Sequence, residues 1–325
     1  MSRLGELFQN YVLRRAGGGQ SAAVFWYLPE PPRVHDAASL ARYRDDAEPS
    51  PLYLMDYRRK LEYTVVDGDS IVALYYGPET GLQRNPEAAS QMALAWHDAW
   101  RETGSVPHRE QFLRYANVLQ HEQDTGGRWA YRFDWGRHIS PWYSSLAQSR
   151  GASVMLRAWR VTREERFHAA ALRAVSRFDR AIEDGGFVAV HPRVGVPYLE
   201  EYPAHPTGVL NGFLASLFGL FEVWEWLGDD QAAALFARYR ASADQLLPHY
   251  STSWWTLYDL DPESPFANVH SPRYHRLATD YLRVLATIAP TPTLTTFRDR
   301  WEAMGGPVAT ARAATLKAVK KLLHR

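Results

Sequence analysis

The sequence contains no cysteine in its 325 residues. This absence excludes disulfide bonds, thiol nucleophiles and thiolate metal sites. No apolar run approaches the roughly 18 residues that span a membrane, and charges interrupt the first 15 residues where a signal peptide would need an apolar core. We therefore expect a soluble, cytoplasmic protein.

The sequence also lacks an excess of charge of either sign. Lys and Arg number 37 against 36 Asp and Glu, a formal net charge of +1, so no global field recruits nucleic acid. The histidines show no ligand spacing with a nearby carboxylate, and we predict neither a metal nor a cofactor. Aromatic residues are plentiful instead, with 12 Trp and 18 Tyr, and such flat amphipathic rings fill cores or line carbohydrate grooves.

The N-terminal part reads as an arm in place of a packed domain. Residues 1–60 carry one amphipathic pattern, a glycine run and a proline-rich stretch. Residues 61–66 and 71–76 are β-branched and aromatic runs around an Asp-Gly turn, which predicts a β-hairpin. We divide the chain into this arm and hairpin, 1–80, and a helical domain, 81–325.

Helical periodicity then recurs in pairs, which predicts a mainly α fold of about four helical hairpins closing into an α/α toroid. The expected pairs are 85–102 with 107–123, 143–161 with 163–183, 207–227 with 229–247, and 273–288 with 293–304. A last helix over 307–323 has lysines on its polar face, and we expect it to be solvated or to contact a second copy in a homodimer.

Short aromatic, strand-like inserts separate the pairs. They cover residues 126–135, 185–203 and 251–260, and each ends shortly before a leading helix begins. If the leading helices lie inside the toroid, the inserts gather at one mouth. The acidic pair Glu200 and Glu201 would then face the other inserts across a cavity.

These inserts and the helices after them resemble the D-glucuronyl C5-epimerase family. The matching segments are WYSSLAQSRGASVMLRAW (142–159), EEYPAHPTGVLNGFLASLFGLFEV (200–223), TLYDL (256–260), and Asn268 followed by Tyr274 and His275. They stand in the family's order, and together they cover about residues 85–305. The resemblance implies an enzyme that inverts C5 of glucuronic acid in heparosan-type chains.

The resemblance also implies an incomplete α/α barrel as the catalytic domain. Animal members carry large β domains before it, whereas only about 80 residues precede it here. Any metal site that those domains hold has no obvious counterpart in this sequence.

Epimerisation at C5 removes a hydrogen next to a carboxylate and returns one from the opposite face. It needs acid–base groups on both faces of the sugar and donors or cations that neutralise the carboxylate. The resemblance transfers Glu201, Tyr202, Tyr258 and Tyr274 as catalytic candidates. A tyrosine donates a proton at neutral pH without adjustment, whereas a glutamate must be desolvated to become an effective base.

Strand geometry raises a conflict at the acidic pair. In a regular strand Glu200 and Tyr202 share one face and Glu201 points to the other. Pro203 indicates that strand pairing ends there, which relaxes the alternation. We follow the resemblance and favour Glu201, with Glu200 as the alternative.

One position departs from the family pattern, in which an arginine, suited to binding a carboxylate, follows YDL. This chain has Asp261 there, which would repel a carboxylate. Another cation must compensate, and the candidates are Arg273, His275, Arg193 and Arg84.

Further residues are candidates for contacting the sugar. Gln148 and Asn211 are amides in the first turns of leading helices, and Trp142 and Tyr143 are rings suited to stacking on a sugar. The hairpin and the residues after it add Tyr75, Tyr76, Gln83 and Asn85 as candidates for lining the mouth.

The predicted partner is thus a uronic-acid-containing carbohydrate, with no nucleic acid and no membrane span. Two alternatives remain at this point. A polysaccharide lyase or a glycoside hydrolase uses similar groups, and a hydrolase would need Asp259 as its second carboxylate. An inactive sugar-binding homologue is the other, with Asp261 as its sign.

Overall fold

Helices form the body of the protein. The computed structural model describes residues 33–35, 50–63, 65–192 and 194–323. The helices are α4 (Pro86–Thr103), α5 (Val106–Glu122), α6 (Ser145–Thr162), α7 (Glu165–Val175), α8 (Leu210–Leu227), α9 (Asp230–Leu246), α10 (Pro272–Ile288), α11 (Pro292–Ala303) and α12 (Pro307–Leu323). The predicted amphipathic segment in the first 32 residues lies outside the described residues.

Strands and 3-10 turns are short. The strands are β1 (Arg33–Val34), β2 (Met55–Asp56), β3 (Ala73–Tyr75), β4 (Leu82–Arg84), β5 (Val188–Val190) and β6 (Pro197–Leu199), and the 3-10 turns are η3 (Arg58–Glu62), η4 (Ile182–Asp184) and η5 (Leu247–Tyr250). The strands form three antiparallel two-stranded sheets, β1–β2, β3–β4 and β5–β6.

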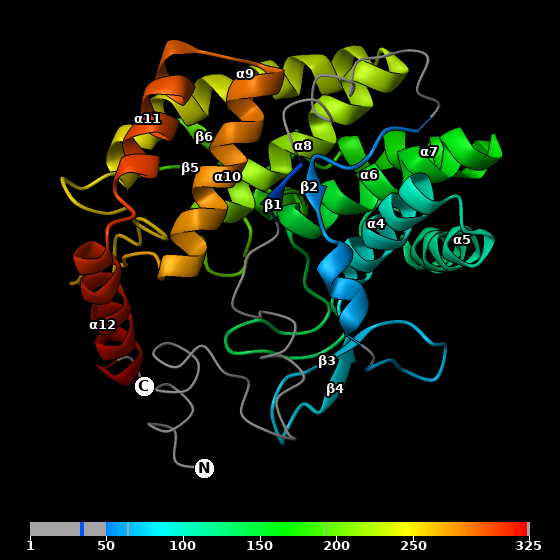
Figure 1. Cartoon of the computed structure of the whole chain (residues 1–325), viewed down its shortest axis with the longest axis horizontal. Coiled ribbons are helices and arrows are strands. Elements are labelled where there is room, and N and C mark those ends of the chain that lie inside the picture. The colour runs from blue at the N-terminus through cyan, green and yellow to red at the C-terminus, as the bar shows by residue number, and fades with distance from the viewer. Residues whose placement is uncertain (1–32, 36–49, 64, 193, 324–325) are drawn as a thin grey trace.

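The helices pack as four consecutive hairpins, α4–α5, α6–α7, α8–α9 and α10–α11 (Figure 1). The leading helices also contact one another in series, α4 with α6, α6 with α8, and α8 with α10. This arrangement is an incomplete α/α toroid with leading helices inside, so the predicted fold class is confirmed.

The extent to which a helix is buried depends on whether it lies in the inner or the outer layer of the toroid. On the inner helix α8 every residue from Leu210 to Val223 is buried, as expected for a helix that is apolar on all sides. The outer helix α5 buries only Phe112, Tyr115, Ala116 and Leu119, a single stripe at helical spacing.

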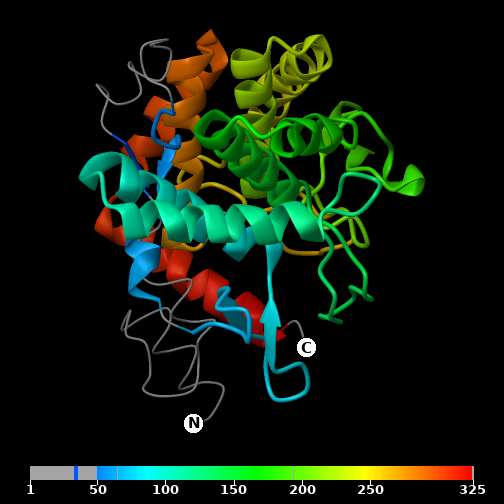
Figure 2. The same cartoon turned by 90° about the vertical axis from the view of Figure 1, so that its right-hand side faces the viewer.

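The two ends of the helical series are joined by the N-terminal segment. The 3-10 turn η3 packs on α4, while β1 packs on α10 and pairs with β2, which directly precedes η3. In both overall views the β3–β4 hairpin and α12 lie at the same end of the helical body (Figures 1 and 2).

The predicted hairpin of 61–66 with 71–76 is confirmed only near its turn. Among the described residues Val66 and Val72 form an antiparallel bridge, and the backbone N–H groups of Asp67 and Ala73 donate to the carbonyls of Ile71 at 2.8 Å and Val65 at 3.1 Å. Asp67 also closes the turn by accepting the backbone N–H of Ile71. The main partner of β3 is β4 instead. Residues 61 and 62 belong to η3, because that segment covers α4 as a 3-10 turn.

Two helix boundaries also differ from the prediction. Helix α7 ends at Val175 instead of continuing to 183, since the chain turns there to bury Phe178, whose carbonyl accepts a 2.6 Å hydrogen bond from the Tyr239 hydroxyl. Helix α8 begins at Leu210 instead of 207, because Gly208 has a positive φ of 69°. Among the described helices, none is both long and apolar enough to cross a membrane.

The seam between α6 and α8 combines an ion pair with a close backbone approach. Arg157 and Glu222 are both fully buried and form a two-pronged pair at 2.8 and 3.1 Å. Further along, a Cβ at Gly219 would lie 2.6 Å from the carbonyl oxygen of Ser149. Because that neighbour is backbone, the helices would have to separate to admit a side chain.

We predict that Gly219→Ala destabilises the fold by about 1–3 kcal/mol despite the better helix propensity of alanine. Urea unfolding followed by circular dichroism measures this. Gly305→Ala is the matched control, because a Cβ at Gly305 meets only a carbonyl oxygen at 3.7 Å. Equal unfolding midpoints for the two variants would contradict the close approach of α6 and α8.

Candidate active site

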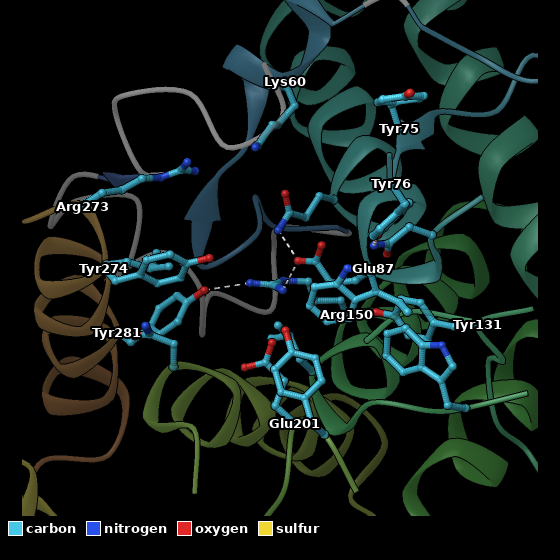
Figure 3. Close-up of a pocket in the computed structure, with 18 residues that line it drawn as sticks. Lys60, Tyr75, Tyr76, Glu87, Tyr131, Arg150, Glu201, Arg273, Tyr274 and Tyr281 are labelled. Carbon is cyan, nitrogen blue, oxygen red and sulfur yellow. Dashed lines mark hydrogen bonds and ion pairs between the residues drawn. The ribbon is translucent and has the colours of Figure 1, made fainter. Parts of the chain in front are cut away.

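A cavity of about 340 Å³ opens among the N-terminal turns of the inner helices and the inserts (Figure 3). The residues that line it are Lys60, Tyr75, Tyr76, Asn85, Glu87, Gln91, Tyr131, Trp135, Trp142, Leu146, Arg150, Glu201, Tyr202, Asn211, Arg273, Tyr274, Leu277 and Tyr281. Segments far apart in the sequence therefore meet around one space.

Glu201 and Tyr202 both line this cavity. Strand alternation does not separate them, because β6 ends before Glu200. The Glu200 carboxylate instead accepts hydrogen bonds from the backbone N–H groups of Tyr202 at 3.0 Å and Gly208 at 2.8 Å, and from the Tyr198 hydroxyl at 3.0 Å. Glu200 thus holds the loop, and Glu201 faces the cavity.

Gly212, in the first turn of α8, makes room for this carboxyl group. A Cβ at Gly212 would lie 2.4 Å from Cβ of Glu201 and 2.5 Å from its Oε2. Such an approach requires glycine, so the Gly in the sequence VLNGF is explained by the position of Glu201.

Burial changes the acidity of Glu201 strongly. Its removal from water raises its pKa from 4.5 to about 8; the charges of Glu200 and Glu87 add to this, while a hydrogen bond with Tyr202 and the charge of Arg150 act against it. When it ionises, this carboxylate is a much stronger base than an ordinary glutamate.

Arg150 of α6 lies in the cavity wall and contacts three other segments of the chain. Its guanidinium pairs with Glu87 of α4 and donates to the hydroxyls of Tyr57 at 2.9 Å and Tyr281 at 2.8 Å. Gln91 also donates to Glu87. Figure 3 shows Arg150 between Glu87 and the Tyr281 hydroxyl.

Tyr274 enters the cavity from the first turn of α10. Ser271 caps this helix, its hydroxyl accepting the backbone N–H of Tyr274 at 3.3 Å, and Pro272 occupies the first helical position. Figure 3 shows the Tyr274 hydroxyl directed toward the centre of the cavity. The Tyr258 ring packs edge-on against Tyr274, with 5.5 Å between ring centroids, but does not itself line the cavity.

Two further cationic side chains line the cavity, Lys60 of η3 and Arg273 of α10 (Figure 3). Burial, together with the charges of Arg273 and Arg150, lowers the pKa of Lys60 well below its ordinary value, although Glu87 acts in the opposite direction. An anionic group brought between these side chains would favour the protonated form of Lys60.

Aromatic rings form the remaining wall. Tyr131 and Trp142 stack with 3.8 Å between centroids, and Trp142 donates through its indole N–H to the carbonyl of Phe133 at 2.8 Å. Trp135, at the rim, keeps 41% of its surface exposed. A flat sugar face fits such a wall.

The structure brings Glu201, Tyr202, Tyr274, Arg273 and Asn211 together at the cavity. From the secondary candidates it adds four more lining residues, which are Tyr75, Tyr76, Asn85 and Trp142.

Several other candidates are placed away from the cavity. Gln148 donates to the carbonyls of Gly127 at 2.7 Å and Ala174 at 3.0 Å, so its side-chain N–H groups bind the backbone. Tyr143 lies under the Arg128 guanidinium, and Gln83 donates to its own hairpin. Like Glu200 and Tyr258, these residues do not line the cavity.

Two candidate cations are also engaged elsewhere. Arg84 is surrounded by the carboxylates of Asp67, Asp69 and Glu122, which cancel its charge toward a substrate. His275 stacks on Trp255 and contacts backbone behind the cavity. Arg193 lies outside the described residues.

Sequence reasoning missed Lys60, Glu87, Arg150, Tyr131 and Tyr281. A signal existed for Tyr281, which follows Tyr274 by two helical turns and so lies on the same face of α10. Arg150 stood inside the WYSSLAQSRGASVMLRAW segment as a charge on an otherwise buried helix. Within the described residues, no group of three or more His, Asp or Glu side chains is arranged to hold a metal ion.

The family of this chain follows from its similarity to known proteins. Residues 123–303, more than half of the chain, match the family model of the D-glucuronyl C5-epimerase C-terminus. The chain belongs to this family. The D-glucuronyl C5-epimerase of Caenorhabditis elegans is 30% identical over 217 residues, which are 60% of this chain and 35% of that protein. The chain thus spans about a third of the length of this relative.

Solved structures show more distant likeness. An unsaturated glucuronyl hydrolase from Streptococcus agalactiae aligns with a TM-score of 0.47 and 14% identity, covering 67% of this chain and 57% of that one. A family 76 mannosidase from Bacteroides thetaiotaomicron aligns with a TM-score of 0.45 and 13% identity, covering 78% of this chain and 76% of that one.

The raised pKa of Glu201 predicts a pH-dependent stability difference. A carboxyl group whose pKa is raised on folding favours the folded state below pH 4.5, and that contribution is lost as the pH rises toward about 8. We expect Glu201→Gln to gain stability relative to the parent by about 1.4 kcal/mol per pH unit over this window. Urea unfolding at pH 5 to 9 measures the difference.

Glu79→Gln is the control, since it neutralises an exposed carboxyl group that does not line the cavity. Its stability should follow that of the parent at every pH. Parallel curves for Glu201→Gln and the parent would show that Glu201 keeps an ordinary pKa.

Proposed function

We propose that this protein inverts C5 of glucuronic acid residues in a heparosan-like oligo- or polysaccharide. The observation that carries the proposal is the meeting of Glu201, a carboxyl group with a raised pKa, and the Tyr274 phenol in one cavity that also holds cationic side chains. Membership of the C5-epimerase family supports the same reaction.

In the proposed reaction Glu201 acts as the base on one face of the sugar. It takes the C5 hydrogen as a proton, and the electron pair of the C–H bond passes into the C5–carboxylate system. Tyr274 then donates its phenolic proton to C5 from the opposite face, which forms the new C–H bond. Exchange with solvent returns the proton from Glu201 and reprotonates Tyr274.

The carbanionic intermediate carries a second negative charge on the sugar carboxylate. Lys60 and Arg273 are the groups proposed to receive it, since both line the cavity and both are cations when a carboxylate lies between them. Burial and the charges of Arg273 and Arg150 lower the pKa of Lys60, and a carboxylate bound beside it would favour its charged form.

The decisive experiment is solvent exchange in heavy water. We expect the protein to incorporate deuterium at C5 of a glucuronate polymer and to form the C5-inverted residue, and Tyr274→Phe to reduce the rate of inversion by about 10²–10⁴ while the protein stays folded. Tyr239→Phe is the matched control, because it removes a phenol that binds the Phe178 carbonyl in the outer layer. Inversion by Tyr274→Phe at the parent rate would remove Tyr274 from the mechanism.

The same incubation separates the competing reactions. A lyase would release an unsaturated, ultraviolet-absorbing product, and a hydrolase would release new reducing ends. The cavity does hold a second carboxylate, Glu87, but it is already engaged by Arg150 and Gln91. Asp259, the partner expected for hydrolysis, is held by the Asn268 amide at 2.6 Å and does not line the cavity.

The pH dependence of kcat/KM provides a further prediction. The active form needs Glu201 ionised and Tyr274 protonated, so the rate should rise about tenfold per pH unit up to the pKa near 8 and level off above it. Initial rates of deuterium incorporation between pH 6 and 9.5 measure this. A rate that is flat from pH 6 to 8 would contradict the assignment of Glu201 as the base.

A further inference from the structure

Two buried amide oxygens of cavity-lining residues, Oε1 of Gln91 and Oδ1 of Asn211, have no hydrogen-bond partner among the described residues, and the orientation of Asn211 can be derived from its neighbours. Asn211 lines the cavity from the first turn of α8 and is only 4% exposed. Its Nδ2 lies 3.1 Å from Nε2 of His270, whereas its Oδ1 is buried without a partner in the described part of the chain. A buried amide oxygen left in this state is unusual and indicates that something outside the protein completes it.

A series of buried hydrogen bonds determines which atom of the Asn211 amide is the nitrogen and which is the oxygen. It starts at the carbonyl oxygen of Trp301, which can only accept, so Nε2 of His275 at 3.1 Å must carry a hydrogen. The other nitrogen of neutral His275, Nδ1, is then an acceptor. Thr256 must therefore donate its hydroxyl hydrogen to it, over 2.8 Å.

The same logic continues to the cavity. Having donated to His275, the Thr256 oxygen accepts from Nδ1–H of His270 at 2.9 Å. His270 is left with a lone pair on Nε2, which accepts from the Asn211 amide N–H. Each bond fixes the next, so the orientation of Asn211 follows from a backbone carbonyl on the far side of the relay.

Turning the Asn211 amide over would break this relay. Oδ1 would then face Nε2 of His270, every bond would have to reverse, and the series would end with a lone pair of His275 against the Trp301 carbonyl. Both histidines also have to be neutral, and burial provides this, lowering the pKa of His275 to about 4 and that of His270 well below its ordinary value.

We propose that Asn211 Oδ1 accepts a hydrogen bond from a sugar hydroxyl, and that Thr256, His270 and His275 are positioning residues that hold it in this orientation. The inference rests on the proposed function, because the ligand is taken to be the uronate-containing sugar. An atom that only accepts cannot bind a carboxylate. The hydroxyl edge of the sugar therefore lies toward α8, and its carboxylate lies toward Lys60 and Arg273.

The relay is tested first without any sugar. Nitrogen-15 NMR of the imidazoles at pH 7 should show His270 protonated at Nδ1 and His275 at Nε2. Thr256→Val, which keeps the shape and removes the hydroxyl, should abolish this opposed pair of tautomers, and the conservative Thr256→Ser should restore it. The same tautomer on both histidines, or no change in Thr256→Val, would overturn the relay whatever the protein binds.

The sugar contact is tested by binding, with heparosan-type tetrasaccharides whose central uronate is intact, 2-deoxy or 3-deoxy. We expect the parent to bind one deoxy compound at least about tenfold more weakly than the intact compound, and Asn211→Ala to bind those two equally. Asn117→Ala, which truncates an exposed amide on α5, is the control and should discriminate like the parent.

Equal discrimination by the parent and Asn211→Ala would overturn the contact while leaving the proposed function intact. Failure of the parent to bind any of the three tetrasaccharides, with the tautomers as expected, would overturn the proposed function and the sugar contact together, and the relay would stand as a structural device.

Discussion

A buried guanidinium holds the incomplete ring together. Arg150 contacts Glu87 on α4, Tyr281 on α10 and Tyr57 beside η3, so one side chain joins both ends of the helical series to the N-terminal segment. Burying such a charge is unfavourable unless it is paired and hydrogen-bonded, and here an ion pair and two phenols supply those contacts. The same charge also lies in the cavity wall, where it limits the rise in the pKa of Glu201.

What could be predicted from the sequence depends on how local the signal is. The four helix pairs were predictable because apolar periodicity persists over whole helices, and Glu201 and Tyr274 came from family motifs. Lys60 could not be found in this way, since its role depends on a 3-10 turn packing across α4, a contact that no local pattern encodes. Arg150 and Glu87 were hidden because charges on inner helices look alike whether they face a cavity or a neighbouring helix.

The aspartate that departs from the family pattern has a local explanation. Asp261 accepts the backbone N–H of Glu263 at 2.9 Å in a turn, and it does not line the cavity. Its charge therefore stands outside the place where a sugar carboxylate would bind. Lys60 and Arg273 line the cavity from the opposite ends of the helical series, so in the proposed function recognition of the carboxylate does not depend on the position after YDL.

Whether a polar cluster borders the cavity, more than which residues it contains, distinguishes a candidate catalytic group from a structural one in this protein. Ser50, His97 and Asp98 reproduce the order of a nucleophilic triad, with 2.7 Å from Oγ to Nε2 and 3.0 Å from Nδ1 to the carboxylate. All three are at most 2% exposed and none lines the cavity, so no substrate reaches the hydroxyl, and the cluster ties the segment before β2 to α4. Glu201 is almost as buried but borders an open space. The loss of water around Glu201 therefore raises the basicity of a carboxylate that a bound molecule can reach. At Asp98 the same loss of water only costs stability, because no molecule reaches that carboxylate.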